Sequence, residues 1–462
     1  MDASAERAEV ETRYEQVSCC PQYFPCPRCG RLGRRKQKRR RQVRTIAYGK
    51  IVYLVVRYAE YRARCDCCKT FRSSPPGIDL KCHYDNRVRQ AVLDRVLEDG
   101  MSVQSVLAAL KRDFLLDLSE GFIYDCLHRE AGRLDMAEYR RWVLEQFRGT
   151  LCVDELHLGR YTLLLATDPL GNFPVAFALV GKNDQDHMRR FLKNLQNWGF
   201  SPQVVITDGS SLYPALLAEL WPQAQHQLCV FHVLQDITTS VLNAVRRLRA
   251  ALLRSGKRGR PRRRGRPSKR MQEYTQQRTT LEEKARCVFL HRWLVVKRRE
   301  NFREHENEQL QTMLQYLPGL GTLRTFMDEI YALFRSDQTP TEAEDRRQAL
   351  IQNEAFSSIP ELALVQAMLT PEKFAKMIAF LQNPAGCKIR TNNHVERTNR
   401  KLRYYEKVRY KWRRRRNIVR FMILAIHRWW QRHPLSQPLR PPTIHEESDA
   451  KIAQQTCYDL SA

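Results

Sequence analysis

The sequence predicts an α/β fold with a mixed sheet and a helical insertion. Residues 151–168 contain two apolar stretches of strand length joined at Gly159-Arg160, a pattern expected of strands that are buried on both faces. A third strand follows after a turn, and the short links make these three strands antiparallel. Helices then alternate with two short strands, which predicts βαβ units. The later elements are expected as a strand at 173–180, a helix at 184–198, a strand at 203–207, a helix at 210–220, a strand at 225–229 and a helix at 230–249.

The length and charge of the chain limit its class and its partners. A chain of 462 residues has room for roughly two to four domains. Its formal net charge of +29 and pI of about 9.8 favour a polyanionic partner, because phosphate neutralisation releases counterions. A membrane surface is the competing polyanion, but the sequence has no run of about 18 apolar residues and its N-terminus is polar and acidic, unlike a signal peptide. We therefore expect a soluble, cytoplasmic protein without a membrane partner, whose 14 cysteines are metal ligands or core thiols.

The N-terminal part of the chain carries two cysteine pairs, Cys26-Pro-Arg-Cys29 and Cys65-Asp-Cys67-Cys68. Two C-x2-C pairs are typical of a zinc ribbon, so we expect one Zn²⁺ to be held by Cys26, Cys29, Cys65 and Cys68. Strand composition between the pairs predicts a hairpin that brings them together, although the spacer is longer than in the usual zinc pattern. Cys67 competes with Cys68 for the fourth position. A set of buried free cysteines is the alternative.

Three short helical patterns follow at residues 86–129. Ser102 and Ser119 are expected to cap the second and third helices. The layout suits a helix-turn-helix unit whose third helix enters the major groove of DNA. Few basic residues lie early on that helix, and a plain helical connector is the alternative.

Three carboxylates occupy positions that are typical of metal-binding or catalytic residues. Asp154 lies within the first apolar strand, where a carboxylate is costly unless it is paired or coordinates a cation; a loop cap or an arginine partner is the alternative. Asp208 follows a short strand and precedes a glycine turn, and α/β sheets place their chemistry at the carboxyl ends of strands. Glu396 lies on a predicted helix and shares its face with Asn399, Arg400 and Arg403. A carboxylate flanked by an amide and two guanidiniums suits a metal ion that faces a phosphodiester.

These residues occur in motifs that resemble those of a known family. The motifs are V-D-E-L-H at 153–157, Y-T-x-x-x-A-T-D at 161–168, T-D-G at 207–209, F-H-V at 231–233 and T-N-N-x-V-E-R-x-N-R-K-L-R at 391–403. With them the chain resembles DDE transposases with a ribonuclease-H-like core, most closely the ISL3 group of bacterial insertion-sequence transposases. The resemblance extends to the paired cysteines and so covers most of the chain. An arginine-rich insert at 257–270 departs from the group.

The resemblance implies that Asp154, Asp208 and Glu396 form one catalytic metal site. Carboxylate oxygens are hard ligands that suit Mg²⁺ or Mn²⁺, and two such ions roughly 4 Å apart would activate water and stabilise the leaving 3′ oxygen. The freed 3′-hydroxyl would then attack target DNA in place of water, which is strand transfer. We expect double-stranded DNA as the partner, at element ends and at the target, a homo-oligomer on that DNA, and association with the bacterial nucleoid.

Two alternative functions use the same residues. A nuclease would need the same metal site for cleavage alone. A zinc-ribbon and helix-turn-helix DNA-binding protein derived from a transposase would lack catalysis, although the presence of all three acids argues against it. Asp168, at the end of the second strand, is the nearest substitute for a catalytic acid. Cys229-x2-His232 resembles half of a metal site without a second pair nearby in the sequence, so a structural or phosphate-side hydrogen bond is the favoured role of His232.

Basic segments are the candidate DNA contacts. The run at 34–44 is expected to contact phosphates through Arg39, Arg40 and Arg41, although such a run is most often a solvated face. Asn399, Arg400 and Arg403 are expected beside the scissile phosphate. The insert repeats Arg-Gly-Arg-Pro like paired AT-hook cores, which would place four arginines in a narrow minor groove, and a plain basic linker is the alternative. These arginines are Arg258, Arg260, Arg264 and Arg266.

Shifts in composition divide the chain into seven predicted segments. They are a polar tail (1–18), a zinc-ribbon-like module (19–80), a helical, helix-turn-helix-like DNA-binding module (81–148), the first part of a ribonuclease-H-like catalytic core (149–250), a basic linker with a helical insertion (251–385), the part of the core with the glutamate helix and a C-terminal helix (386–433), and a disordered tail (434–462).

Overall fold

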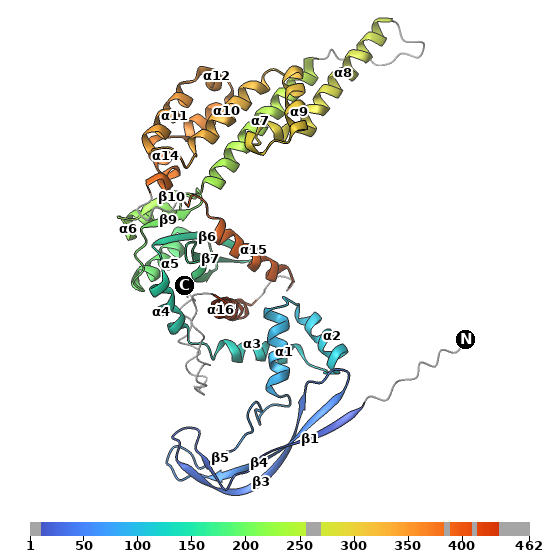
Figure 1. Ribbon diagram of the computed structural model, residues 1–462, viewed down its shortest axis with the longest axis vertical. Helices are drawn as coiled ribbons and strands as arrows, with labels where there is room; N and C mark the ends of the chain where they lie inside the picture. Colours follow the sequence, from blue (N-terminus) through green and yellow to red (C-terminus); the bar gives the residue numbers. More distant parts are fainter. Residues whose placement is uncertain (1–10, 256–268, 383–388, 409–413, 434–462) are drawn as a thin grey trace, which may run out of the picture.

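A computed structural model describes residues 11–255, 269–382, 389–408 and 414–433. Figure 1 shows three parts along the long axis of the molecule: an N-terminal sheet at one end, a central sheet covered by helices, and a helical insertion at the other end. The four insert arginines and the predicted C-terminal tail lie outside the described residues. Within the described part of the chain, no helix is long and apolar enough to cross a membrane.

The central sheet has five strands in the order β10-β9-β6-β7-β8. Neighbours β6, β7 and β8 are antiparallel, whereas β9 runs parallel to β6 and β10 runs parallel to β9. Every residue of β8 and β9 is buried, which explains their unbroken apolar sequences. The predicted α/β class and the ribonuclease-H-like mixed sheet are therefore confirmed. The strands are β6 (Thr150–Leu158), β7 (Tyr161–Asp168), β8 (Phe173–Val180), β9 (Val204–Thr207) and β10 (Gln225–Leu228), with helices α5 (Gln185–Asn197) and α6 (Tyr213–Leu220) in the connections.

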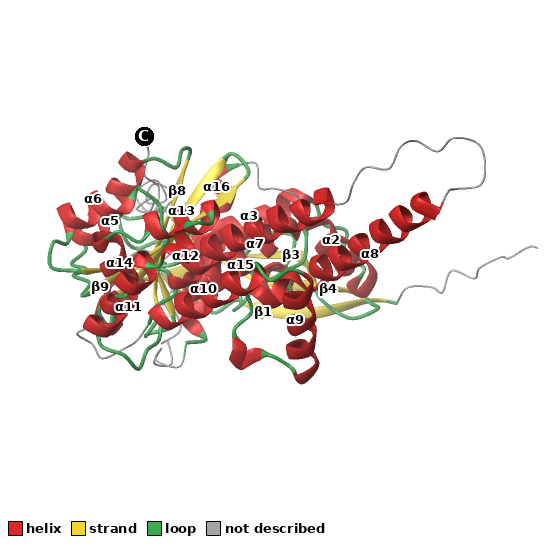
Figure 2. Ribbon diagram, turned by 90° about the horizontal axis from the view of Figure 1, so that it is seen from above, coloured by secondary structure: helices red, strands yellow, loops and turns green. Residues whose placement is uncertain are grey.

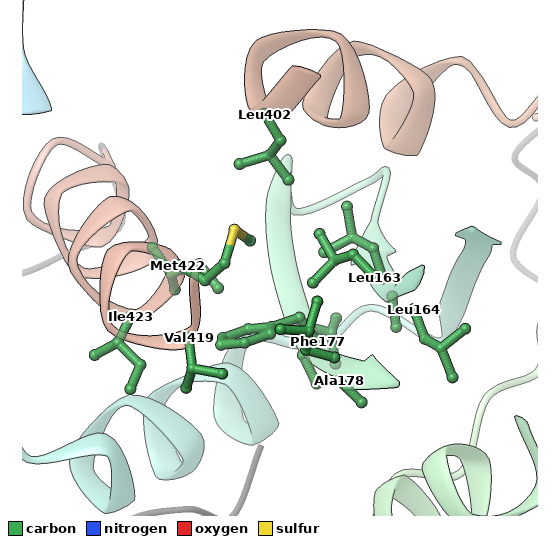
Figure 3. Close-up of a cluster of buried hydrophobic side chains, with 14 of the residues drawn as sticks. Leu163, Leu164, Phe177, Ala178, Leu402, Val419, Met422 and Ile423 are labelled. Atoms are coloured by element: carbon green, nitrogen blue, oxygen red, sulfur yellow. The ribbon is translucent and has the colours of Figure 1, made fainter. Parts of the chain in front are cut away.

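Helices from both ends of the core sequence pack on this sheet. Figure 3 shows Val419 and Met422 on the side of α16 that faces Phe177 of β8, with Leu402 of α15 nearby. The four helices before the sheet belong to the same hydrophobic core, and α16 contacts α1 and α3 directly. The predicted caps are confirmed, since the Ser102 and Ser119 hydroxyls accept backbone N–H groups of the first turns. These helices are α1 (Asn86–Leu97), α2 (Val103–Phe114), α3 (Glu120–Ala131), α4 (Met136–Gln146), α15 (Asn393–Val408) and α16 (Arg415–Gln431).

The N-terminal sheet extends further than the sequence predicts. Residues 12–18, predicted as part of a polar tail, belong to strand β1, which pairs in parallel with β4 at the sheet edge. The basic run is a strand as well, because the long antiparallel ladder with β4 satisfies its backbone while Arg34, Arg39 and Arg40 stay exposed. Edge strands that face solvent need no apolar pattern, so composition did not reveal them. The strands are β1 (Thr12–Cys19), β2 (Tyr23–Pro25), β3 (Leu32–Thr45), β4 (Ile51–Arg62) and β5 (Thr70–Arg72).

The helical insertion has its own hydrophobic core. Figure 2 shows α8 reaching away from the other helices of the molecule. Helical patterns in the sequence at 271–304, 308–316, 320–335 and 371–381 predict helices near α8, α9, α10 and α14, whereas α11, α12 and α13 were not predicted. The helices are α7 (Val230–Ser255), α8 (Lys269–His291), α9 (Glu304–Tyr316), α10 (Leu320–Leu333), α11 (Pro340–Gln352), α12 (Glu354–Ser357), α13 (Pro360–Met368) and α14 (Pro371–Met377), with short 3-10 helices at Arg292–Val295, Arg299–Asn301 and Ala379–Gln382.

Asp168 has a structural role at the turn between β7 and β8. Its carboxylate accepts backbone N–H groups of Arg148, Leu170 and Gly171, each at 2.8 Å, and the residue is fully buried. It lies opposite the start of β6, several residues before Asp154, because Thr167 pairs with Cys152. Asp168 is therefore a turn-stabilising residue.

Replacement of Asp168 tests this structural role. Asp168→Ala leaves three backbone N–H donors without their acceptor, of which that of Gly171 is buried, so we expect the free energy of unfolding to fall by about 2–3 kcal/mol in urea denaturation followed by tryptophan fluorescence. The control is Asp186→Ala, since Asp186 is an exposed aspartate on α5 and its loss should change stability little. Unchanged stability of the Asp168 variant together with lost DNA cleavage would instead place this carboxylate in the chemistry.

Candidate active site

The register of two parallel strands brings Asp154 and Asp208 together. Cys152 of β6 pairs with Ile206 of β9, so Asp154 and Asp208 each lie two residues further along strands of the same direction. β9 ends at Thr207, which leaves Asp208 at the carboxyl end of its strand. The Asp208 carboxylate accepts the backbone N–H of Ser210 at 2.9 Å, so the turn that follows fixes its orientation.

Glu155 joins this pair, although no role was predicted for it from the sequence. Ligand oxygens of Asp154, Glu155 and Asp208 lie within 4.8 Å of one another. Side chains alternate between the two faces of a strand, so a prediction from periodicity places neighbouring residues on opposite sides. The signal in the sequence was a second carboxylate inside an apolar strand, which is as costly as the first.

Burial and mutual repulsion perturb these carboxylates. Burial raises the pKa of Asp154 to about 6, and the negative charge of Asp208 adds to this rise. Burial also raises the pKa of Glu155 to about 7, again with contributions from both aspartates. Glu155 Oε1 is buried without a hydrogen-bond partner among the described residues. The cluster thus has an excess of negative charge that a bound cation would relieve.

Two amides attach α15 and the segment before it to β6. The Asn392 side chain donates to the Val153 carbonyl oxygen at 3.1 Å, and the Asn399 side chain donates to Asp154 Oδ2 at 2.8 Å. Asn399 is 7 % exposed and its side-chain NH2 group is bound to the aspartate, while its predicted contact with DNA stays a prediction. Glu396 precedes Asn399 by one helical turn and lies on the same face of α15.

Glu396 lies beside His232 and Cys229. His232 Nε2 and Glu396 Oε1 are 3.8 Å apart, and both side chains are partly exposed. Ligand atoms of Cys229, His232 and Glu396 lie within 4.8 Å of one another, a second group that is separate from the one formed by the aspartates and Glu155. The Cys229 thiol raises the pKa of His232 to about 9, and Glu396 contributes to this shift. The convergence of all three predicted acids on one ion stays a prediction.

A family comparison places the chain in a known group. The model of the DDE transposase family ISL3, described as a transposase, matches residues 151–420, which is more than half of the chain. The protein is an ISL3-family transposase. The matched span begins at β6 and ends in α16, so it includes both carboxylate groups. A search of curated proteins gave no match.

The arginines that were predicted to contact DNA differ in whether their side chains are free in solvent or already bound to other residues. Arg400 and Arg403 are exposed on α15. Arg39 pairs with Glu60 at 3.2 Å and Arg41 donates to the Leu80 carbonyl, whereas Arg40 is exposed on β3.

Helix α3 is poorly suited to the major groove. Its exposed or partly exposed residues include three acids, and its one arginine, Arg129, pairs with Asp125 and Asp79. Its apolar side packs against α16. The helix-turn-helix role of this segment stays a prediction, with a helical connector as the alternative.

The N-terminal cysteines form a cluster that is compatible with a zinc site. The sulfurs of Cys26, Cys65, Cys67 and Cys68 lie within 4.8 Å of one another. Cys29, a predicted ligand, is exposed and lies 3.3 Å from the Cys67 sulfur. Although burial raises the pKa of the Cys26 thiol, hydrogen bonds from the backbone N–H groups of Arg28 and Cys29 lower it to about 6. This turn favours the thiolate that zinc requires.

Serine variants identify the fourth zinc ligand. We expect Cys67→Ser to retain one zinc per chain and Cys29→Ser to lose it, because Cys29 completes the turn that already stabilises the Cys26 thiolate. Elemental analysis of the purified, reduced proteins measures the number of zinc ions per chain. The reverse result would assign the fourth position to Cys67, and zinc in neither the variants nor the unmodified protein would refute a zinc ribbon.

Proposed function

We propose that this transposase cleaves DNA at the ends of its element and transfers the freed strands to target DNA, using divalent metal ions held by Asp154, Asp208 and Glu396. The observation that carries the proposal is the adjacency of Asp154 and Asp208 on parallel strands, with α15 fixed to Asp154 through Asn399. Membership of the transposase family supports the same chemistry.

The residues present fit a hard divalent cation. Every ligand at the aspartate pair is a carboxylate oxygen, the donor that Mg²⁺ and Mn²⁺ prefer. Buried oxygens of Glu155 and Glu396 lack hydrogen-bond partners within the described ranges, so each has an unused lone pair. Like charges this close are unfavourable unless a cation is bound or a proton is shared.

The chemistry is an in-line displacement at phosphorus. Bound Mg²⁺ or Mn²⁺ would supply the positive charge that activates the attacking oxygen and offsets charge on the leaving 3′ oxygen. Asn399 holds the Asp154 carboxylate in one orientation, which a metal ligand requires. Glu155 adds a carboxylate next to the aspartates. In the first reaction the attacking oxygen belongs to water, and in the second to the freed 3′-hydroxyl.

The remaining modules would position DNA. Exposed Arg400 and Arg403 follow Glu396 on α15 and neutralise phosphates next to the scissile bond. The strand that carries Arg40, in the N-terminal module with the cysteine cluster, adds contacts further along the element end. Two ends must be brought together for transposition, which calls for a homo-oligomer on DNA at the nucleoid.

Substitutions of the acids test the catalytic proposal. Asp154→Asn and Glu396→Gln remove one ligand charge each, so Mg²⁺-dependent nicking of element-end DNA should fall below detection while DNA affinity stays within about threefold. Asn399→Ala should slow nicking by about 10- to 100-fold, since it removes a partner of a metal ligand. Asp186→Asn, an exposed site on α5, is the matched control. Normal nicking by either acid variant would contradict the site.

A cleavage assay on the unmodified protein also separates the alternatives. Specific binding of element ends without Mg²⁺- or Mn²⁺-dependent nicking would identify a DNA-binding protein without catalysis. Nicking without joining to a target would identify a nuclease.

The exposed arginines of α15 should govern the salt dependence of DNA binding. Joint replacement of Arg400 and Arg403 by alanine removes two phosphate contacts, so the slope of log affinity against log salt should decrease by about 1 to 2. Arg39→Ala is the control, because Arg39 is already paired with Glu60 and should change the slope less. Equal slopes in the double variant and the unmodified protein would remove α15 from the DNA interface.

A further inference from the structure

The group formed by Cys229, His232 and Glu396 differs chemically from the aspartate pair. Cys229 follows β10, His232 lies in the first turn of α7, and Glu396 comes from α15, more than 160 residues later. One ligand atom from each lies within 4.8 Å of the other two. The insertion brings them together, since the Val230 N–H donates to the Arg390 carbonyl at 2.8 Å.

Two polar atoms of this group have no hydrogen bond among the described residues, although Glu396 Oε1 lies 3.8 Å from His232 Nε2. His232 Nδ1 and Glu396 Oε1 are buried without a hydrogen bond to any described residue. Cys229 is 1 % exposed, and its sulfur accepts the backbone N–H of Asn392 at 3.2 Å. That hydrogen bond orients the sulfur, and Asn392 is itself held by its side-chain bond to Val153. Hydrogen bonds to a residue outside the group therefore hold the Cys229 sulfur in place, as is common for metal ligands.

The donor set selects the kind of ion. Thiolate and imidazole are ligands of Zn²⁺ and other borderline metals, whereas Mg²⁺ prefers oxygen alone. Three protein ligands leave one of the four tetrahedral positions open, and the partial exposure of His232 and Glu396 allows an ion to enter.

We propose that Cys229, His232 and Glu396 form a second metal site, selective for Zn²⁺, beside the catalytic carboxylates. A Glu396 carboxylate bound to zinc is withdrawn from the Mg²⁺ centre, so zinc in excess inhibits cleavage. This consequence rests on the proposed catalytic role of Glu396, whereas the existence of the zinc site does not.

Zinc titration of the full chain tests the site. In buffer with excess Mg²⁺, equilibrium dialysis followed by elemental analysis should give two zinc ions per chain, one in the N-terminal cysteine cluster and one here. Cys229→Ser and His232→Asn should each bind one, with affinity at the second site reduced by at least about 100-fold. Cys152→Ser is the matched control, since Cys152 is a fully buried thiol of β6 outside the group, and it should still bind two.

Cobalt gives a second measurement that does not depend on activity. Co²⁺ added to protein with its N-terminal site filled by zinc should produce a thiolate-to-cobalt absorption band that is absent in Cys229→Ser and present in Cys152→Ser. Binding of a single zinc by the unmodified chain, or retention of the second ion by both site variants, would overturn the proposal.

Inhibition assays separate this proposal from the catalytic one. Zinc should inhibit Mg²⁺-dependent nicking by the unmodified protein and inhibit Cys229→Ser far less, each compared with its own rate without zinc. Equal inhibition of both proteins would contradict the link between zinc and Glu396. A chain that binds one zinc and still nicks DNA refutes only the second site, and a chain that binds two but never nicks refutes only the catalytic proposal.

Discussion

Two amide side chains hold the last part of the active site against the first. Asn392 bonds the backbone of Val153 and Asn399 bonds the carboxylate of Asp154, across sequence separations of 239 and 245 residues. Both contacts are to the strand that carries the first acid, so α15 is fixed relative to β6 whatever the intervening chain does. The position of Glu396, the access of metal ions and the direction of the α15 arginines all depend on this attachment.

The insertion between these elements is compatible with a fixed site because its two ends meet. The Val230 N–H bonds the Arg390 carbonyl, and the Gln227 side chain bonds the backbone of Met377 and Phe380. A long insertion costs little once its ends are closed, since the loop entropy grows slowly with length. Its helices pack around a hydrophobic core that reaches the sheet at Leu228 of β10. The same closure places Cys229 and His232 next to Glu396.

The sequence was informative where burial imposes a pattern. Strands β6 to β9 and the two aspartates could be predicted because runs of buried apolar residues indicate the strands, and a carboxylate within or just after such a run is costly. Strands β1 and β3 could not, since their exposed side chains follow no apolar alternation and their stability comes from pairing with β4. Glu155 was missed because strand periodicity places it opposite Asp154. The meeting of Cys229 and His232 with Glu396 depends on the path of the insertion, which local sequence does not encode.

The central claim is that Asp154, Asp208 and Glu396 share one metal centre when DNA is bound. Anomalous diffraction from crystals of the transposase grown with Mn²⁺ and element-end DNA tests it most directly. If the three acids share one centre, manganese peaks appear with Asp154 and Asp208 as ligands and with Glu396 turned toward them from His232. Manganese held by Asp154, Glu155 and Asp208 alone, with Glu396 still beside His232 and Cys229, would contradict it.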